Sequence, residues 1–147
     1  PLSIYENRTA RPLVSFAERV RFIAADDAEI FTAYRDGGFA GILADCGTPC
    51  VPGERTFASG AAEILERKNT FLRVRAVLPA RGFLIFSQNH LPGWQASIDG
   101  DEVQLTTVNS VFMGVEVPAG EHEVAFRYAN PCGAVPGFVA CLKSLLP

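Results

Sequence analysis

The fold is decided by residues 82–128, which read GFLIFSQNHLPGWQASIDGDEVQLTTVNSVFMGVEVPAGEHEVAFRY. Asp99-Gly100 lies between two alternating runs, and this dipeptide favours a two-residue hairpin because both turn positions need a positive φ. Pro118-Ala119-Gly120 marks a second turn. After it, Val124–Tyr128 alternates between large apolar side chains and small or charged ones, which is typical of a strand with one buried face. The stretch therefore predicts a near-continuous β-meander.

The rest of the chain predicts more short strands and a single helix. Phe83–Phe86 is apolar on both faces, so we expect a central strand that is covered on both sides. A helix of about ten residues is predicted from Asp26, a suitable N-cap, to Arg35, before Gly37-Gly38. Further strands are predicted at residues 12–16, 19–23, 39–44, 61–67 and 70–77. This pattern predicts a mostly β protein, an antiparallel β-sandwich of jelly-roll-like form with one short α-helix.

Length and composition limit the class of protein. The chain has 147 residues and 48% hydrophobic content, which predicts one domain, assigned to residues 1–130. The net charge is −3 and the basic residues are scattered, which argues against a nucleic-acid partner. Residues 131–147 form an apolar tail that is shorter than the roughly 20 residues of a membrane span. Two interpretations stay open for this tail: the start of a transmembrane helix, which we favour, or a short helix packed on the sandwich.

The four cysteines, at positions 46, 50, 132 and 141, allow three pairings between them. Cys46 and Cys50 are spaced to close a small loop by a disulfide in an oxidising compartment. A disulfide or free thiols are favoured over zinc, because zinc sites use closer cysteine pairs or nearby histidines. No metal or other cofactor is predicted.

The loop 87–94 holds the densest group of candidate ligand-binding side chains: Gln88, Asn89, His90 and Trp94. An indole ring beside amide and imidazole groups is typical of a sugar site, which combines ring stacking with directed hydrogen bonds. The competing interpretation is that Trp94 begins a strand and buries its ring, and the shared face with Ala96 and Ile98 favours it. A lone loop histidine such as His90 is more often solvated than catalytic.

Other polar residues have structural explanations. The hairpin accounts for Asp99 and Asp101, and His122 is expected to be a hydrogen-bonded residue at a strand edge. The sequence contains neither a phosphate-binding glycine loop nor the nucleophile or zinc-helix motifs of hydrolases. Catalysis by this domain is therefore not predicted.

Three segments together resemble the YfhO-like family of polytopic bacterial membrane proteins, which is related to GT-C glycosyltransferases. The first is Leu91-Pro92-Gly93-Trp94-x-Ala96-x-Ile98-Asp99-Gly100. The second comprises Asn109, Phe112-Met113-Gly114-Val115 and Val117-Pro118-Ala119-Gly120-x-His122-x-Val124-x-Phe126-x-Tyr128. The third, Ile4-Tyr5-Glu6-Asn7 with Ala10-Arg11-Pro12, is similar to the family's entry segment, although Arg11 stands where leucine is usual.

The resemblance implies an extracytoplasmic β-sandwich at the end of a bacterial membrane protein. In such proteins sugar transfer from a polyprenyl-phosphate donor is attributed to the membrane part, so no catalytic residue can be carried over to this chain. The implied role is that of a non-catalytic accessory domain that contacts a glycan or a polyprenyl-linked sugar. A free-standing carbohydrate-binding module and a purely structural interaction domain are the alternatives.

Overall fold

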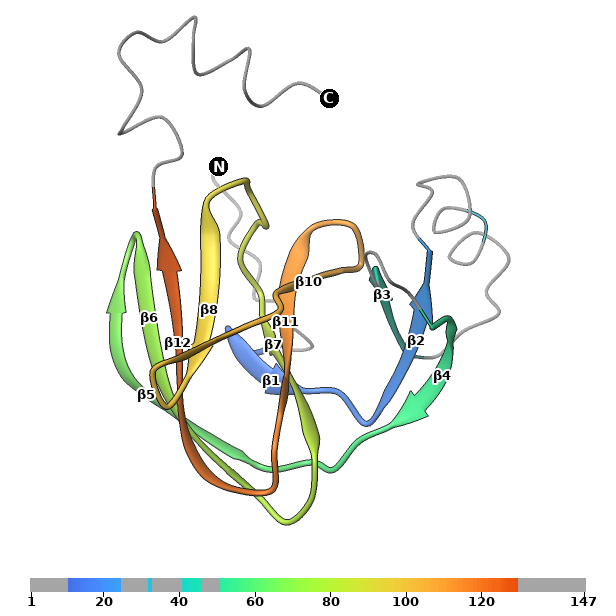
Figure 1. The fold of residues 1–147 in the computed structure, drawn as a ribbon, viewed down its shortest axis with the longest axis horizontal. Helices are drawn as coiled ribbons and strands as arrows, with labels where there is room; N and C mark the ends of the chain where they lie inside the picture. Colours follow the sequence, from blue (N-terminus) through green and yellow to red (C-terminus); the bar gives the residue numbers. More distant parts are fainter. Residues whose placement is uncertain (1–10, 25–31, 33–40, 46–50, 130–147) are drawn as a thin grey trace, which may run out of the picture.

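The computed structural model describes residues 11–24, 32, 41–45 and 51–129. Within these residues the chain forms two β-sheets (Figure 1). The strands are β1 (Val14–Phe16), β2 (Arg19–Ile23), β3 (Ile42–Asp45), β4 (Gly53–Thr56), β5 (Ala61–Lys68), β6 (Phe71–Leu78), β7 (Gly82–Phe86), β8 (Trp94–Ile98), β9 (Asp101–Val103), β10 (Thr106–Val108), β11 (Phe112–Val117) and β12 (Gly120–Tyr128). The predicted mostly β sandwich is confirmed.

The two sheets differ in size and shape. One has the order β1-β7-β11-β10-β3-β2-β4, and the other has the order β5-β6-β12-β8-β9. The pairs within them are antiparallel except β2 with β3, which run parallel. Residues 24–41 separate these two strands, which is enough chain for the crossover that a parallel pair needs.

The main core lies between the sheets and consists of alternate residues of β6, β7, β8, β11 and β12. Phe86 packs against Phe126 and Trp94, with ring centroids 5.2 and 5.8 Å apart. Burial of each such side chain contributes roughly 1.5–3 kcal/mol. The period-2 alternation of these strands is what directs their apolar side chains into one layer.

A second core forms because the seven-stranded sheet curls on itself (Figure 1). Beyond β4, Ala58 bridges to Gly82 of β7, and the N–H of Phe57 donates to the carbonyl of Glu18 at 2.9 Å. Inside the curl, the rings of Phe57 and Phe22 lie 5.4 and 5.8 Å from the ring of Phe83. Strand β7 is therefore buried on both faces, as predicted.

The predicted near-continuous meander is wrong. Strands β11 and β12 lie in different sheets, and so do β7 and β8. Pro118-Ala119 is thus a crossover between the sheets rather than a hairpin turn. The alternating pattern shows which face of a strand is buried, but both sheets bury a face in the same core, so it does not identify the partner strand.

Two β-hairpins occur within residues 82–128. Asp99 and Gly100 have φ angles of 52° and 94°, which confirms the predicted turn between β8 and β9. Asn109 and Ser110, with φ angles of 51° and 60°, form a second such turn between β10 and β11. The side chain of Asn109 also accepts a hydrogen bond from the buried N–H of Leu43 at 3.0 Å, which ties the turn to β3.

Several predictions concern parts of the chain outside the described residues. They are the helix 26–35 apart from Thr32, the Cys46–Cys50 loop, the entry segment before Arg11 and the apolar tail from residue 131. The 1–130 domain boundary likewise stays a prediction. Among the described residues, no helix has the length and apolar character needed to cross a membrane.

Candidate functional site

The structure places the residues of the predicted sugar loop in different environments. Trp94 is only 8% exposed, and its ring packs between Phe86 and Tyr128 at centroid distances of 5.8 and 5.5 Å. Its indole faces therefore lie inside the main core. Gln88 and Asn89 are exposed, on the outside of the same loop. The loop thus separates the aromatic ring from the amides that were predicted to act with it.

His90 connects its loop to the β10–β11 hairpin. Its backbone N–H donates to the carbonyl of Val111 at 2.6 Å, and its Nδ1 lies 2.8 Å from the hydroxyl of Thr107. Partial burial lowers the pKa of His90 below its ordinary value, and the charge of Asp45 opposes that shift. These contacts hold the loop against the β10–β11 hairpin.

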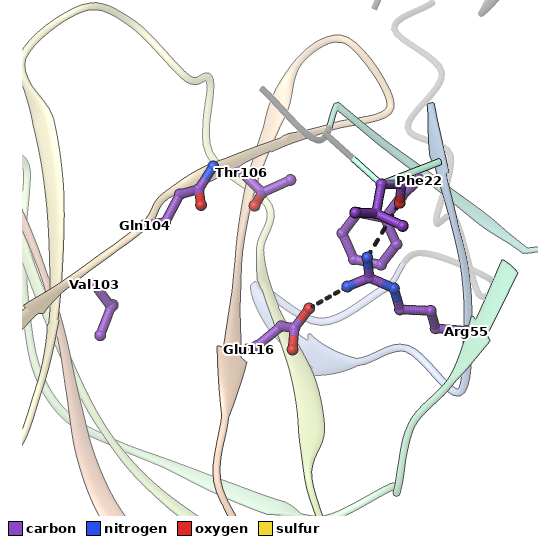
Figure 2. Close-up of a pocket in the computed structure, with 7 residues that line it drawn as sticks. Phe22, Arg55, Val103, Gln104, Thr106 and Glu116 are labelled. Carbon is purple, nitrogen blue, oxygen red and sulfur yellow. Dashed lines mark hydrogen bonds and ion pairs between the residues drawn. The ribbon is translucent and has the colours of Figure 1, made fainter. Parts of the chain in front are cut away.

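A different group of side chains surrounds a hollow of about 340 Å³ beside the curl of the seven-stranded sheet (Figure 2). We call it the curl hollow. It was not predicted from the sequence. Its lining comes from β2, β4, β9, β10, β11 and the segments next to β4 and β9. It consists of Phe22, Val51, Arg55, Val103, Gln104, Thr106 and Glu116.

Strand register explains why polar groups point into this hollow. Arg55 pairs with Val20, so its side chain shares the inner face of the curl with Val20 and Phe22. Glu116 pairs with Phe83 on the same inner face. Glu116 is a charged residue between Val115 and Val117, on a strand that is otherwise buried on both sides. Such a residue is the sequence signal that could have indicated the site.

Two guanidinium groups hold the carboxylate of Glu116. Arg55 Nη1 lies 3.1 Å from one oxygen and Arg81 Nη1 lies 3.3 Å from the other. The Arg55 guanidinium also stacks over the ring of Phe22 at 4.3 Å and donates to the carbonyl of Val51 at 3.2 Å. Arg55 and Glu116 remain 36% and 32% exposed, so both can still reach a molecule in the hollow.

The curl hollow thus presents donors, acceptors and apolar carbon on one surface. Arg55 donates, Glu116 accepts, and Gln104 and Thr106 can do both. In the part of the chain that the structure describes, Glu116 is the only carboxylate in the lining. Among the described residues, no cluster of histidine, cysteine or acidic side chains is arranged to hold a metal ion. The arrangement suits recognition of a small polar molecule.

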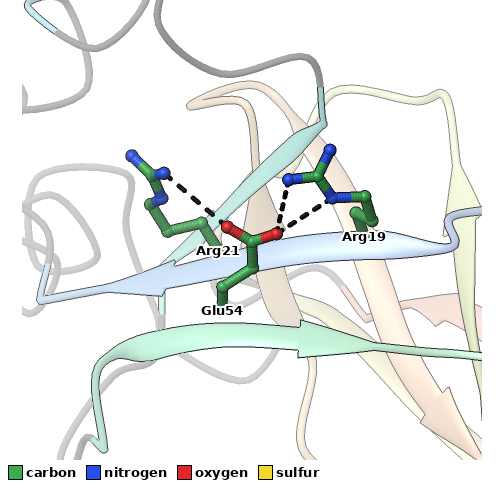
Figure 3. Close-up of polar contacts among 3 residues, drawn as sticks. All are labelled: Arg19, Arg21 and Glu54. Carbon is green, nitrogen blue, oxygen red and sulfur yellow. Dashed lines mark hydrogen bonds and ion pairs between the residues drawn. The ribbon is translucent and has the colours of Figure 1, made fainter.

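The outer face of the same strands carries a second charged group (Figure 3). Glu54 lies 2.7 Å from Arg19 and 3.7 Å from Arg21. The hydrogen bond from Arg19 is the main cause of the lowered pKa of Glu54. These residues alternate with Val20 and Arg55 and so point away from the curl hollow. They fasten the edge strand β4 to β2.

Asp99 and His122 form a pair. The sequence explains Asp99 as a turn residue and does not predict this contact. Asp99 Oδ2 lies 2.7 Å from His122 Nδ1, while its other oxygen accepts the backbone N–H of Glu123 at 2.8 Å. His122 Nε2 lies 3.2 Å from the carbonyl of Ala119. Both ring nitrogens therefore face acceptors, which the doubly protonated imidazolium satisfies. The pair joins the turn between β8 and β9 to the start of β12.

This pair is expected to make stability depend on pH. The Asp99 contact raises the pKa of His122 above its ordinary 6.5, so this stabilisation is present below about pH 6.5 and is lost as the pH rises through the raised value. His122 in turn lowers the pKa of Asp99 below its ordinary 3.8, so that contribution is present above about pH 4 and is lost as the pH falls further. Between these limits the pair stabilises the fold most.

The variant Asp99→Asn tests this pH dependence, because asparagine suits the same turn but carries no charge. We expect the melting temperature of the unmodified chain to fall more between pH 6 and pH 9 than that of the variant. Thermal unfolding followed by circular dichroism at each pH measures both. Parallel curves for the two proteins would contradict the assignment.

Comparison with known proteins gives one match. The model of the family described as bacterial membrane protein YfhO matches residues 61–139, more than half of the chain. The match begins at the first residue of β5 and includes every strand from there to β12. No curated protein and no solved structure matches the chain. The chain belongs to the YfhO family of bacterial membrane proteins.

Proposed function

We propose that this chain is a non-catalytic, extracytoplasmic accessory domain of a polytopic, glycosyltransferase-like bacterial membrane protein, and that it contacts a glycan or polyprenyl-linked sugar through the curl hollow. The mixed lining of that hollow is the observation that supports the proposal. Family membership supports the membrane context.

The size and chemistry of the hollow suit one sugar unit. Its volume of about 340 Å³ lies at the lower end of the range for small-molecule sites. A sugar ring presents hydroxyl groups that both donate and accept, together with apolar C–H faces. Arg55, Gln104, Thr106 and Glu116 offer the matching polar groups, while Val51 and Val103 offer apolar walls.

The same lining supports binding rather than catalysis. Glycoside cleavage typically uses a pair of carboxyl groups on opposite sides of the bond. Glu116 is the one carboxylate among the described residues that line the hollow, and two arginines hold it. The domain accordingly positions a sugar for chemistry carried out elsewhere in the parent protein.

Substitution of Gln104 tests the assignment. Titration calorimetry with short hexose oligosaccharides, and with a short-chain polyprenyl-phosphate hexose, should show weak binding by the unmodified chain. Gln104→Ala is expected to raise the Kd up to about tenfold, because one or two hydrogen bonds are lost. Gln104 is exposed, so its substitution should leave the fold intact.

Gln88→Ala is the matched control, since it removes an equally exposed amide from the loop 87–94. Its Kd should equal that of the unmodified chain. Loss of binding in Gln88→Ala but not in Gln104→Ala would return the site to that loop. Absence of binding to every sugar would favour the purely structural module.

The membrane assignment has its own test. Native protein from cells is expected to stay in the membrane pellet after an alkaline carbonate wash. Release into the supernatant would instead favour a free-standing carbohydrate-binding module.

A further inference from the structure

The chain enters and leaves the described domain at one end. Near the start, the carbonyl of Leu13 accepts the N–H of Ser87 at 2.8 Å. After β12, the N–H of Ala129 donates to the carbonyl of Gly93, also at 2.8 Å. We call this region, which holds the loop 87–93, the turn 68–70 and the turn 109–111, the entry end; it lies at the top of Figure 1.

Apolar side chains are exposed at the tips of the entry end. Leu91 is 53% exposed and Val111 is 43% exposed. The backbone hydrogen bond from His90 to Val111 places these two tips side by side. Pro92 next to them is also exposed. The backbone hydrogen bonds of Leu13 and Ala129 place both ends of the described domain against the same loop.

The described residues of the entry end also include basic side chains. Four exposed cations belong to the entry end: Arg11, Arg67, Lys68 and Arg127. The described acids at this end are Asp45 and Glu66, and Glu66 contacts Lys68 at 2.6 Å and Arg73 at 3.6 Å. Arg127 is the last residue of β12 on its outer face, and it pairs in register with Phe71 and Gln95.

The opposite end has the reverse charge. Its turns and strand ends carry the carboxylates of Glu18, Asp99, Asp101, Glu102 and Glu121. Of its cations, His122 contacts Asp99, and Arg81 contacts Glu116. The chain is acidic as a whole, with a net charge of −3. Among the described residues, however, exposed cations outnumber carboxylates at the entry end, which also carries the exposed apolar tips.

We propose that the entry end rests on the surface of an anionic lipid bilayer, with Leu91 and Val111 in the headgroup region and the cations of the same end on lipid phosphates. Apolar tips with adjacent lysine and arginine are the combination that favours the membrane interface. Each basic residue near such a surface contributes roughly a fivefold gain in partitioning. The proposal rests on family membership and not on sugar binding at the curl hollow.

Vesicle co-sedimentation of the 147-residue chain tests this proposal. The chain is expected to bind vesicles of phosphatidylglycerol and phosphatidylcholine in equal parts, and to bind pure phosphatidylcholine vesicles far less. The double variant Lys68→Gln/Arg127→Gln should lower partitioning onto the anionic vesicles about 30-fold. Added salt should weaken the binding of the unmodified chain.

Matched variants locate the contact. Arg19→Gln/Arg75→Gln makes the same change in charge away from the entry end and should leave partitioning nearly unchanged. Leu91→Ser should weaken binding, whereas Val77→Ser, at a residue 42% exposed on a strand face, should not. Thermal unfolding of every variant checks that the fold is retained.

Three outcomes would overturn the proposal. They are equal binding to neutral and anionic vesicles, equal losses in the two double variants, and competition by millimolar inorganic phosphate. The last would indicate a soluble phosphate site instead of a bilayer surface. Failure of sugar binding at Gln104 would leave these results unaffected, so the two proposals can fail separately.

Discussion

Replacing Trp94 with alanine is expected to lower the free energy of unfolding by about 4 kcal/mol. The ring is 8% exposed and contacts Phe86 and Tyr128, so its removal leaves a cavity between the two sheets. Small domains are stable by roughly 5–15 kcal/mol, so the loss takes up much of the total. Urea unfolding followed by circular dichroism measures it.

The control for this substitution is Gln95→Ala, at the next residue of β8, whose side chain is exposed on the outer face. Its effect should stay within about 0.5 kcal/mol. If Trp94→Ala instead kept its stability and lost sugar binding, the indole would be a ligand platform and the buried assignment would be wrong.

Adding a single methyl group at Gly114 is expected to cost about 3 kcal/mol, at the upper end of the range for overpacking. A Cβ built there would lie 2.5 Å from Phe83 Cε1 and 2.8 Å from Val108 Cγ2. Both neighbours belong to the second core, inside the curl, where there is little room to move. The Gly114→Ala variant therefore forces the curl to open or Phe83 to shift.

A double-mutant cycle with Phe83→Leu separates crowding from other effects of the added methyl. The smaller side chain removes the two nearest clashing atoms, both on the Phe83 ring, so Gly114→Ala should cost less in that background. Urea unfolding of the four proteins provides the comparison. An unchanged cost would show that Val108 or the backbone at Gly114, rather than the Phe83 ring, resists the substitution.

The structure explains the family resemblance in terms of packing. In the segment 94–98 the identified positions Trp94, Ala96 and Ile98 all face the main core, while Gln95 and Ser97 face outward. Among the later identified positions, Met113, Val115, Val117, Val124 and Phe126 also face the main core, and Gly114 is required by its contact with Phe83. The shared pattern thus identifies the fold and its turns, whereas the residues that line the curl hollow lie at other positions.

The curl hollow could not be predicted from local patterns. Arg55 and Glu116 lie on β4 and β11, which are separated in the sheet by β2, β3 and β10. They contact each other only because the sheet curls until Ala58 reaches Gly82. In the predicted loop 87–94, Trp94 begins strand β8 and buries its ring in the core, whereas Gln88 and Asn89 lie between strands and are exposed.

The sequence by itself determined most of the strands, their buried faces and the Asp99-Gly100 hairpin, because these depend on local sterics and on which side chains avoid water. Only the tertiary structure decided that β11 and β12 join different sheets, that the larger sheet curls, and that exposed cations and apolar tips share the entry end. Many pairings bury an amphipathic strand equally well, so the choice among them depends on how all strands pack together.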